Sequence, residues 1–351
     1  MKAGMDDLVT LSADVGGTNL NLGLVTRRGG VFQLLLQRKF PTAAERSLHE
    51  PVLRFLEEGR SLGIVPPAAA CVSGAGPVQE GRIVLTNAPW GVDGPALEQL
   101  LGIPVQVVND FTALSHGVLL LNPGDPDQLR PIPHPDGSHP AADPDGTVLI
   151  VGAGTGLGVG CVVRGGGPPR VLPSEGGHIG LPITGEATLD LWRYLRGQFP
   201  GPPGAESAVS GPGLAALLSF LVQTGRVPKS ASVEAILARN PAEQPEAIAT
   251  GAAADPACGR AMDLFVELYA RVCADLCTVF LPTGGLFLAG GIAAKNEQRF
   301  LADDRFMRSF ESNYRGHINT LVRATPIHIV RDYNVSLYGA ADLLYRDSPH
   351  P

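Results

Sequence analysis

Short apolar runs alternate with helical stripes along this chain, and glycine, proline, asparagine and aspartate separate them. Short apolar runs between such breakers are typical of β-strands. The predicted strands are residues 8–13, 20–26, 68–73, 83–86, 105–108, 147–151, 157–163 and 286–289. Residues 122–145 are rich in proline, aspartate and histidine without periodicity, which predicts a long surface loop.

Apolar residues spaced three and four apart predict helices between these strands. The clearest stripe runs from Leu214 to Val222, where Ser210 suits the N-cap and Pro212 the first turn. The other predicted helices are 49–62, 111–121, 261–281 and 335–345. Strands that alternate with helices indicate an α/β fold.

One pattern occurs twice. Residues 8–26 and 147–163 both read as an apolar strand, a tight glycine-rich turn and a second apolar strand, and they begin about 140 residues apart. That separation is close to the size of one domain, and 351 residues exceed one ordinary core. The repeat therefore suggests a duplicated α/β fold with a ligand held between its halves.

Composition narrows the functional classes. Hydrophobic residues make up 44%, charged residues 17%, and the net charge is −7, with no basic cluster of the kind that attracts nucleic acid or an anionic membrane. The five cysteines form no CxxC pair, which argues against a disulfide framework or a zinc knuckle. The short polar N-terminus does not read as a signal peptide, and 147–163 reads as strand–turn–strand, so we expect a cytoplasmic protein.

The first glycine turn is Asp14-Val15-Gly16-Gly17-Thr18-Asn19. Glycines allow close approach of a ligand and positive φ, and successive N–H groups form a concavity for anions. Asp14, at the strand end, suits Mg²⁺ bound through water, because Mg²⁺ keeps several waters and accepts few carboxylates. From this motif alone, a plain β-hairpin stays an equal alternative.

The second glycine turn spans 152–158 and includes Gly154, Thr155 and Gly156. No helix follows it directly and GxxxxGK[ST] is absent, so neither a dinucleotide fingerprint nor a P-loop is predicted. A third turn, Gly290-Gly291, follows a strand and offers a flat backbone on which a base can lie. Taken in isolation, a tight strand-to-helix turn is the more ordinary interpretation.

Six short motifs follow one another along the chain: DVGGTN (14–19), NDF (109–111), GAGTGLG (152–158), EGGH (175–178), ESAVSGPG (206–213) and LAGG (288–291). In this order they resemble the motifs of the bacterial glucokinases, within the actin/hexokinase/Hsp70 superfamily. The resemblance extends from Ser12 to about Ala341. It implies two actin-like (ribonuclease H-like) α/β domains with an interdomain active-site cleft: 1–110 with 332–351, and 111–331.

The resemblance also implies an ATP-dependent glucokinase that transfers the γ-phosphoryl group to the 6-hydroxyl of glucose, at the entry to glycolysis. ATP, with Mg²⁺, is expected at both glycine hairpins, with adenosine at Gly290 and Gly291. Asp110 is the expected general base, because a sugar hydroxyl needs a carboxylate to accept its proton. From spacing alone, Asp110 is rather the N-cap of the following helix.

The residues expected to bind the sugar share polar side chains that suit vicinal hydroxyls. They are Asn87, Asn109, Asp110, Glu175, His178 and Glu206. Without the resemblance, Glu175 and Glu206 read as solvated loop charges and His178 as a surface histidine.

The chain departs from the family pattern in two places. Leu20-Asn21 stands where many members have Ala-Arg, and Ile179 to Pro182 stands where many have an acidic residue or Phe-Ala-Pro. The cysteine cluster of the related sugar repressors is absent, which disfavours a DNA-binding repressor. The alternatives are a kinase of another hexose or amino sugar, and a non-catalytic sugar-sensing protein. We expect glucose and ATP as partners, no nucleic acid or membrane, and a possible homodimer.

Overall fold

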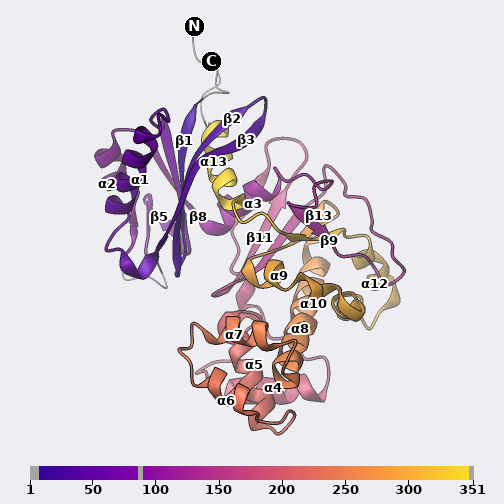
Figure 1. Ribbon diagram of the computed structural model, residues 1–351. Helices are drawn as coiled ribbons and strands as arrows, with labels where there is room; N and C mark the ends of the chain where they lie inside the picture. Colours follow the sequence, from indigo (N-terminus) through magenta and orange to yellow (C-terminus); the bar gives the residue numbers. More distant parts are fainter. Residues whose placement is uncertain (1–7, 86–89, 348–351) are drawn as a thin grey trace. The chain divides into compact units, whose positions relative to one another are not determined.

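The computed structural model describes residues 8–85 and 90–347 (Figure 1). These residues form two compact units. The first contains the described residues up to Pro123 and those from Asp332 onward, and the second is Gly124–Arg331. The mixed α/β class expected from the sequence is confirmed in both units.

The first unit is built on a five-stranded sheet. Its strands are β1 (Val9–Val15), β2 (Asn19–Arg28), β3 (Val31–Pro41), β4 (Ala69–Gly74) and β8 (Val105–Asn109), in the order β3-β2-β1-β4-β8. Strands β1, β4 and β8 are parallel, whereas β1, β2 and β3 form antiparallel pairs. The carboxyl ends of three neighbouring strands therefore meet at one edge of the sheet.

Apolar side chains cover both faces of this sheet. One core includes Leu11, Leu22, Phe55 and Leu97 and lies under helices α1 (His49–Ser61) and α2 (Gly94–Leu101). The opposite face packs against α3 (Asp110–Val118) and α13 (Val335–Asp347) through Cys71, Ala113, Ala340 and Leu343.

Helices α3 and α13 meet at their backbones. A Cβ added at Gly117 would lie 1.9 Å from the carbonyl oxygen of Val335, and one added at Gly339 would lie 1.8 Å from that of Ala113. Only glycine fits at such a distance. Because α3 packs on α13, it belongs to the first unit, so this unit extends beyond the boundary that we placed after residue 110.

A small sheet of three two-residue strands completes the first unit: β5 (Val78–Gln79), β6 (Arg82–Ile83) and β7 (Val92–Asp93). The prediction of a strand over 83–86 is wrong at Val84 and Leu85, which have no strand partner, and residue 86 lies outside the described residues. Val84 is exposed, and its apolar side chain made the run look longer than the strand is.

The second unit is built on a six-stranded sheet. Its strands are β9 (Leu129–Pro131), β10 (Val148–Ala153), β11 (Leu157–Val163), β12 (Arg170–Leu172), β13 (Gly285–Ala289) and β14 (Ile327–Val330), in the order β12-β11-β10-β13-β14-β9. Strands β10, β13 and β14 are parallel. Strand β9 lies within the predicted loop 122–145 and pairs with β14, so this loop is tied to the sheet edge.

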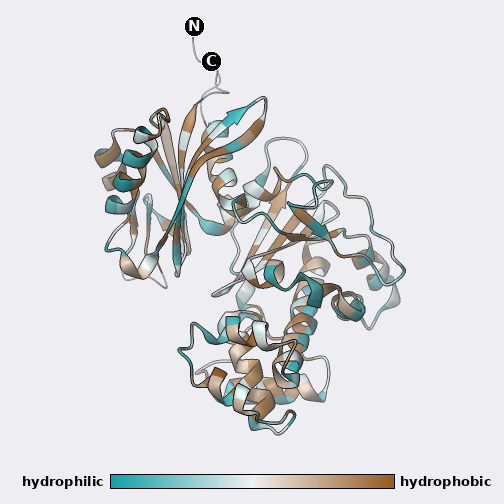
Figure 2. Cartoon of the chain, in the orientation of Figure 1, coloured by the Kyte–Doolittle hydropathy of each residue, from teal (hydrophilic) through white to brown (hydrophobic). Residues whose placement is uncertain are grey.

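The helices of the second unit form its largest core. They are α4 (Glu186–Arg196), α5 (Gly211–Gln223), α6 (Ala231–Leu237), α7 (Gln244–Gly251), α8 (Pro256–Phe280), α9 (Gly291–Lys295), α10 (Glu297–Leu301), α11 (Arg305–Phe310) and α12 (Gly316–Arg323). Hydrophobic residues run along α5 and α8 (Figure 2). Tyr269 of α8 donates a hydrogen bond of 2.7 Å to the carbonyl oxygen of Val151, which joins this helix to the sheet.

Capping residues explain where two of these helices begin. Ser210 is the N-cap of α5 as predicted, and its Oγ accepts a hydrogen bond of 3.0 Å from the N–H of Gly213. Helix α8 begins at Pro256, ahead of the predicted start at 261, because Asp255 accepts a hydrogen bond of 2.8 Å from the N–H of Ala257. None of the helices in the described ranges is long and apolar enough to span a membrane.

Candidate active site

Polar side chains gather at the carboxyl ends of β1, β4 and β8 in the first unit. Asp14 pairs with Ser73, and Gly74 pairs with Asn109, so the ends of the three strands lie in one row. Ser73 Oγ donates a hydrogen bond of 3.1 Å to Asp14 Oδ1. Because carboxyl ends of parallel strands are the usual place for ligands in α/β sheets, this edge is the candidate site of the first unit.

Asp14 has a perturbed pKa. Burial raises it most, and the negative charge of Asp110 raises it further, while the Ser73 hydrogen bond and the positive charge of Lys39 lower it, which leaves the pKa at about 6. Asp14 and Asp110 are therefore close enough to repel each other. A cation or a proton placed between them would relieve that repulsion.

Asp110 is the first residue of α3, and the N-cap is its neighbour Asn109. Asn109 Oδ1 accepts a hydrogen bond of 2.9 Å from the N–H of Phe111, and Asn109 Nδ2 donates one of 3.2 Å to the carbonyl oxygen of Gly76. The interpretation of Asp110 as the N-cap is thus wrong, although Asp110 Oδ1 also lies 2.9 Å from the Phe111 nitrogen. Both polar atoms of the Asn109 amide therefore form hydrogen bonds with the protein backbone, a role that its sequence position did not indicate.

The first glycine hairpin connects β1 to β2. Gly16 donates a hydrogen bond of 2.9 Å to the carbonyl oxygen of Asn19, and a Cβ at Gly16 would lie 3.2 Å from that oxygen. Neither Gly16 nor Gly17 has positive φ, so the glycines here provide space rather than left-handed backbone. Thr18 and Asn19 are exposed at the tip.

Thr42 holds this hairpin from the side. Its N–H donates a hydrogen bond of 2.9 Å to the carbonyl oxygen of Thr18, and its Oγ1 donates one of 2.8 Å to that of Gly16. Trp90 Nε1 in turn donates a hydrogen bond of 3.2 Å to the Thr42 carbonyl oxygen. Sequence reasoning missed Thr42 and Ser73, because their roles depend on which strands are neighbours.

In the second unit, two of the predicted glycine turns lie side by side. Gly152 of β10 pairs with Ala289 of β13, which places the Gly290 turn next to the second hairpin. Gly290 has a φ of +88°, and a Cβ there would lie 2.5 Å from the carbonyl oxygen of Ala153. Glycine is required at this position, whereas a Cβ at Gly291 would meet open space.

The N-terminus of α5 lies against the second hairpin. Gly154 donates a hydrogen bond of 2.8 Å to the carbonyl oxygen of Gly156 and accepts one of 2.7 Å from the N–H of Gly211, the first residue of α5. Thr155 is exposed at the tip. Backbone N–H groups and a helix N-terminus are therefore gathered here, which suits an anionic ligand.

Glu206 connects the expected sugar residues to the second hairpin. It lies in the 3₁₀ helix η4 (Ala205–Ser207), and its Oε2 accepts a hydrogen bond of 2.7 Å from the N–H of Leu157. A Cβ at Gly156 would lie 2.6 Å from the same oxygen, so Gly156 makes room for the carboxylate. The interpretation of Glu206 as a solvated loop charge is thus wrong.

Glu175 directly precedes the 3₁₀ helix η3 (Gly176–His178), and His178 is its last residue. Both side chains are exposed, with 3.9 Å between Glu175 Oε2 and His178 Nε2. This segment lies beside η4, because Ala205 donates a hydrogen bond of 2.7 Å to the carbonyl oxygen of Ile179. The second unit therefore brings Glu175, His178 and Glu206 together beside the hairpin. Asn87, the remaining predicted sugar residue, lies outside the described residues.

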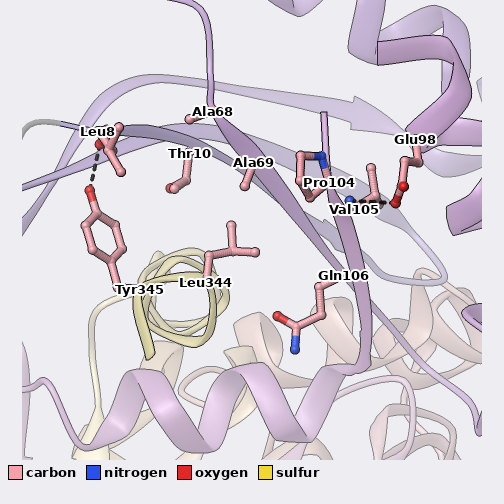
Figure 3. A pocket seen from close by; sticks show the side chains of 10 residues that line it. All are labelled: Leu8, Thr10, Ala68, Ala69, Glu98, Pro104, Val105, Gln106, Leu344 and Tyr345. Atoms are coloured by element: carbon pink, nitrogen blue, oxygen red, sulfur yellow. Dashed lines mark hydrogen bonds between the residues drawn. The ribbon is translucent and has the colours of Figure 1, made fainter. Parts of the chain in front are cut away.

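A cavity of about 520 Å³ lies at the opposite end of the first unit's sheet (Figure 3). It is lined mainly by apolar side chains at the amino ends of β1, β4 and β8 and by the end of α13. Tyr345 donates a hydrogen bond of 2.6 Å to the carbonyl oxygen of Leu8 at its rim. None of the predicted site residues within the described ranges lines this cavity, so we do not assign it to the candidate active site.

Comparison with known proteins identifies the family. The family model described as Glucokinase matches residues 11–347. This chain belongs to the glucokinase family. Two curated glucokinases, from Synechocystis sp. and Nostoc sp., are 32% and 30% identical to it, over 94% of this chain in both cases and over 96% and 97% of those proteins. The resemblance based on the six motifs is therefore confirmed.

The fold agrees with this assignment. The crystal structure of a glucokinase from an Antarctic psychrotroph superposes with a TM-score of 0.78 at 27% sequence identity, and covers 97% of this chain and 99% of that one. The glucokinase family has the actin-like ATPase fold, and the two sheets described above supply its α/β elements.

Proposed function

We propose that this protein transfers the γ-phosphoryl group of ATP to the 6-hydroxyl of glucose and so forms glucose 6-phosphate in the cytoplasm, at the entry to glycolysis. The observation that carries the proposal is the pair of carboxylates, Asp14 and Asp110, at the carboxyl end of the first unit's sheet. Asp14 binds the cation that accompanies ATP, and Asp110 accepts the proton of the attacking hydroxyl. Membership of the glucokinase family supports the substrate pair.

Asp110 acts as the general base. The 6-hydroxyl is a weak nucleophile at neutral pH, and its oxygen attacks phosphorus more readily when a carboxylate accepts its proton. The N-cap bond from Asn109 fixes the first turn of α3 and therefore the position of Asp110. As the oxygen–phosphorus bond forms, the bond from the γ-phosphorus to the bridging oxygen breaks, and the electron pair leaves with ADP.

The residues around Asp14 fit Mg²⁺. A hard cation prefers oxygen ligands and keeps several waters, and Asp14, Ser73 and the nearby Asp110 offer carboxylate and hydroxyl oxygens. Mg²⁺, when bound, neutralises charge on the triphosphate. Backbone N–H groups at the two glycine hairpins hold the phosphates. Gly290 and Gly291, whose turn is next to the second hairpin, bind the adenosine.

Glu175, His178 and Glu206 hold the sugar. Carboxylates accept hydrogen bonds from vicinal hydroxyls, and charge strengthens these bonds. Because Glu206 also accepts a hydrogen bond from the Leu157 N–H, this sugar residue is joined directly to the second glycine hairpin.

The test is a coupled assay of the purified protein with ATP and Mg²⁺, in which ADP release is followed with glucose, mannose, glucosamine and no sugar. We expect rapid turnover with glucose and slow release without sugar. Faster turnover with another sugar would reassign the substrate. Glucose binding in calorimetry without turnover of any sugar would replace the kinase by a sugar-sensing protein.

A further inference from the structure

One face of the first unit's sheet carries a row of polar residues across its strands. Asp14 of β1 pairs with Asn21 of β2, and Asn21 pairs with Lys39 of β3. Ser73 of β4 continues the row on the other side of Asp14. Directly paired residues project from the same face of a sheet, so all four side chains lie on one face.

Helix α13 covers this face only in part. Gln37 lies on the same face as Lys39, two residues before it, and its Nε2 donates a hydrogen bond of 2.7 Å to Asn334 Oδ1, directly before α13. The same Nε2 lies 2.8 Å from Asn21 Oδ1, so Asn21 is engaged within the row. Lys39 lies beyond this network and is exposed.

The chain leads from Lys39 directly to the first glycine hairpin. Asn19, where the hairpin ends, pairs with Pro41, and Thr42 donates hydrogen bonds to the carbonyl oxygens of Gly16 and Thr18. Lys39 is three residues before Thr42 and faces the same side of the sheet as Asp14. Its positive charge lowers the pKa of Asp14, against the effects of burial and Asp110.

We propose that Lys39 binds the triphosphate of ATP beside the first glycine hairpin, in the row that it forms with Asn21 and Asp14. This inference rests on the proposed kinase function. A lysine ammonium is a point charge with three donors on a flexible stem, which suits phosphate oxygens. Among the described residues, no carboxylate forms an ion pair with Lys39 within 4.0 Å, so its ammonium can turn toward a phosphate.

The test compares Lys39→Met, Lys39→Arg and a matched control, Arg38→Met. Arg38 is the preceding residue on β3, but it faces the other side of the sheet and pairs with Glu58 of α1. Affinities for ATP and for adenosine are measured by calorimetry without sugar, and KM for ATP is measured in the coupled assay. We expect Lys39→Met to weaken ATP binding about tenfold and to leave adenosine binding unchanged, because a charge-assisted hydrogen bond is lost.

Lys39→Arg is expected to keep most of the ATP affinity, and Arg38→Met all of it. Equal ATP affinity in Lys39→Met and the unaltered protein would overturn the proposal. So would an equal loss in Arg38→Met, which would indicate a general surface-charge effect, or a parallel loss of adenosine affinity, which would indicate a disturbed fold. Failure of the proposed function would differ from all of these, because the unaltered protein would then phosphorylate no sugar.

Discussion

The Glu206 carboxylate accepts a hydrogen bond of 2.7 Å from the backbone N–H of Leu157, at the point where the second glycine hairpin enters β11. A residue expected to bind the sugar thus also fixes a loop expected to bind phosphates. Only glycine at position 156 leaves room for this contact, because a Cβ there would lie 2.6 Å from Glu206 Oε2. The sugar and nucleotide affinities of the enzyme should therefore be linked through this side chain.

Glu206→Ala should raise KM for both glucose and ATP, since it removes a sugar ligand and releases the Leu157 N–H. The loss of one charge-assisted hydrogen bond corresponds to roughly a tenfold change or more in the affected KM. Glu206→Gln keeps an acceptor for Leu157 and should restore KM for ATP more fully than KM for glucose. Glu175→Ala is the control, because Glu175 is exposed and is expected to affect glucose alone. A change confined to glucose in Glu206→Ala would contradict the link.

Asp110→Asn should lower kcat by about 10²–10⁴-fold and change KM for glucose little, because the proton of the 6-hydroxyl loses its acceptor. The measurement is steady-state turnover in the coupled assay, accompanied by thermal unfolding. The melting temperature should change little, because the N-cap of α3 is Asn109. Near-normal turnover in this variant would remove Asp110 from the role of general base.

Asp14→Asn should stabilise the protein without ligands above pH 6. The pKa of Asp14 is about 6 in the folded protein against an ordinary 3.8, so the folded state binds more protons between these values and loses stability as the pH rises through them. The gain is on the order of 1–3 kcal/mol at pH 8 and vanishes below about pH 4. Chemical denaturation at both pH values measures it, with Ser73→Ala for comparison. The same variant should lose activity, because Mg²⁺ loses a carboxylate.

If Asp14→Asn gave no extra stability at pH 8, the pKa of Asp14 would not be raised in the folded protein, and neither its burial nor the charge of Asp110 would act on it as described. Ser73→Ala should act in the opposite direction to Asp14→Asn at pH 8, since the Ser73 hydrogen bond stabilises the charged carboxylate.

Gly339→Ala should destabilise the first unit by roughly 1–3 kcal/mol or more, because the added methyl group would lie 1.8 Å from the carbonyl oxygen of Ala113 and force α13 away from α3. Turnover should fall as well, since α3 begins at Asp110. Gly316→Ala in α12 is the matched control, because a Cβ there meets open space and alanine favours helix. Equal melting temperatures for the two variants would contradict the close packing of α3 and α13.

The periodicity of the sequence predicted most strands and the long helices, because one buried face leaves a regular apolar pattern. Strand β3 was not predicted. It is an edge strand with much of its surface exposed, so its residues do not alternate clearly. Helix α2 was also missed, although Asp93 as N-cap and Pro95 in the first turn were signals of it in the sequence.

The candidate site was predicted only where a motif carries the residue. Asp14, Asp110 and the glycine turns belong to such motifs, whereas Ser73 and Thr42 do not. Their importance follows from strand order and register, which place Ser73 beside Asp14 and Thr42 beside the first hairpin. Strand order and register cannot be predicted from the residues next to Ser73 or Thr42 in the sequence. The contact from Glu206 to Leu157 joins residues that are 49 positions apart, with β11, β12 and α4 between them, so the local sequence did not indicate it.

The backbone contact of α3 and α13 has a consequence for how the protein is made. A ribosome releases a chain from its amino end, so Gly124–Arg331 emerges before α13 does. The second unit can fold while synthesis continues. The first unit, which carries Asp110, has to wait for the last helix, and until then α3 exposes the apolar surface that α13 will cover. Nascent chains arrested before Gly339 should therefore contain a protease-resistant second unit and a protease-sensitive first unit, and catalytic competence should appear only after α13 has left the exit tunnel.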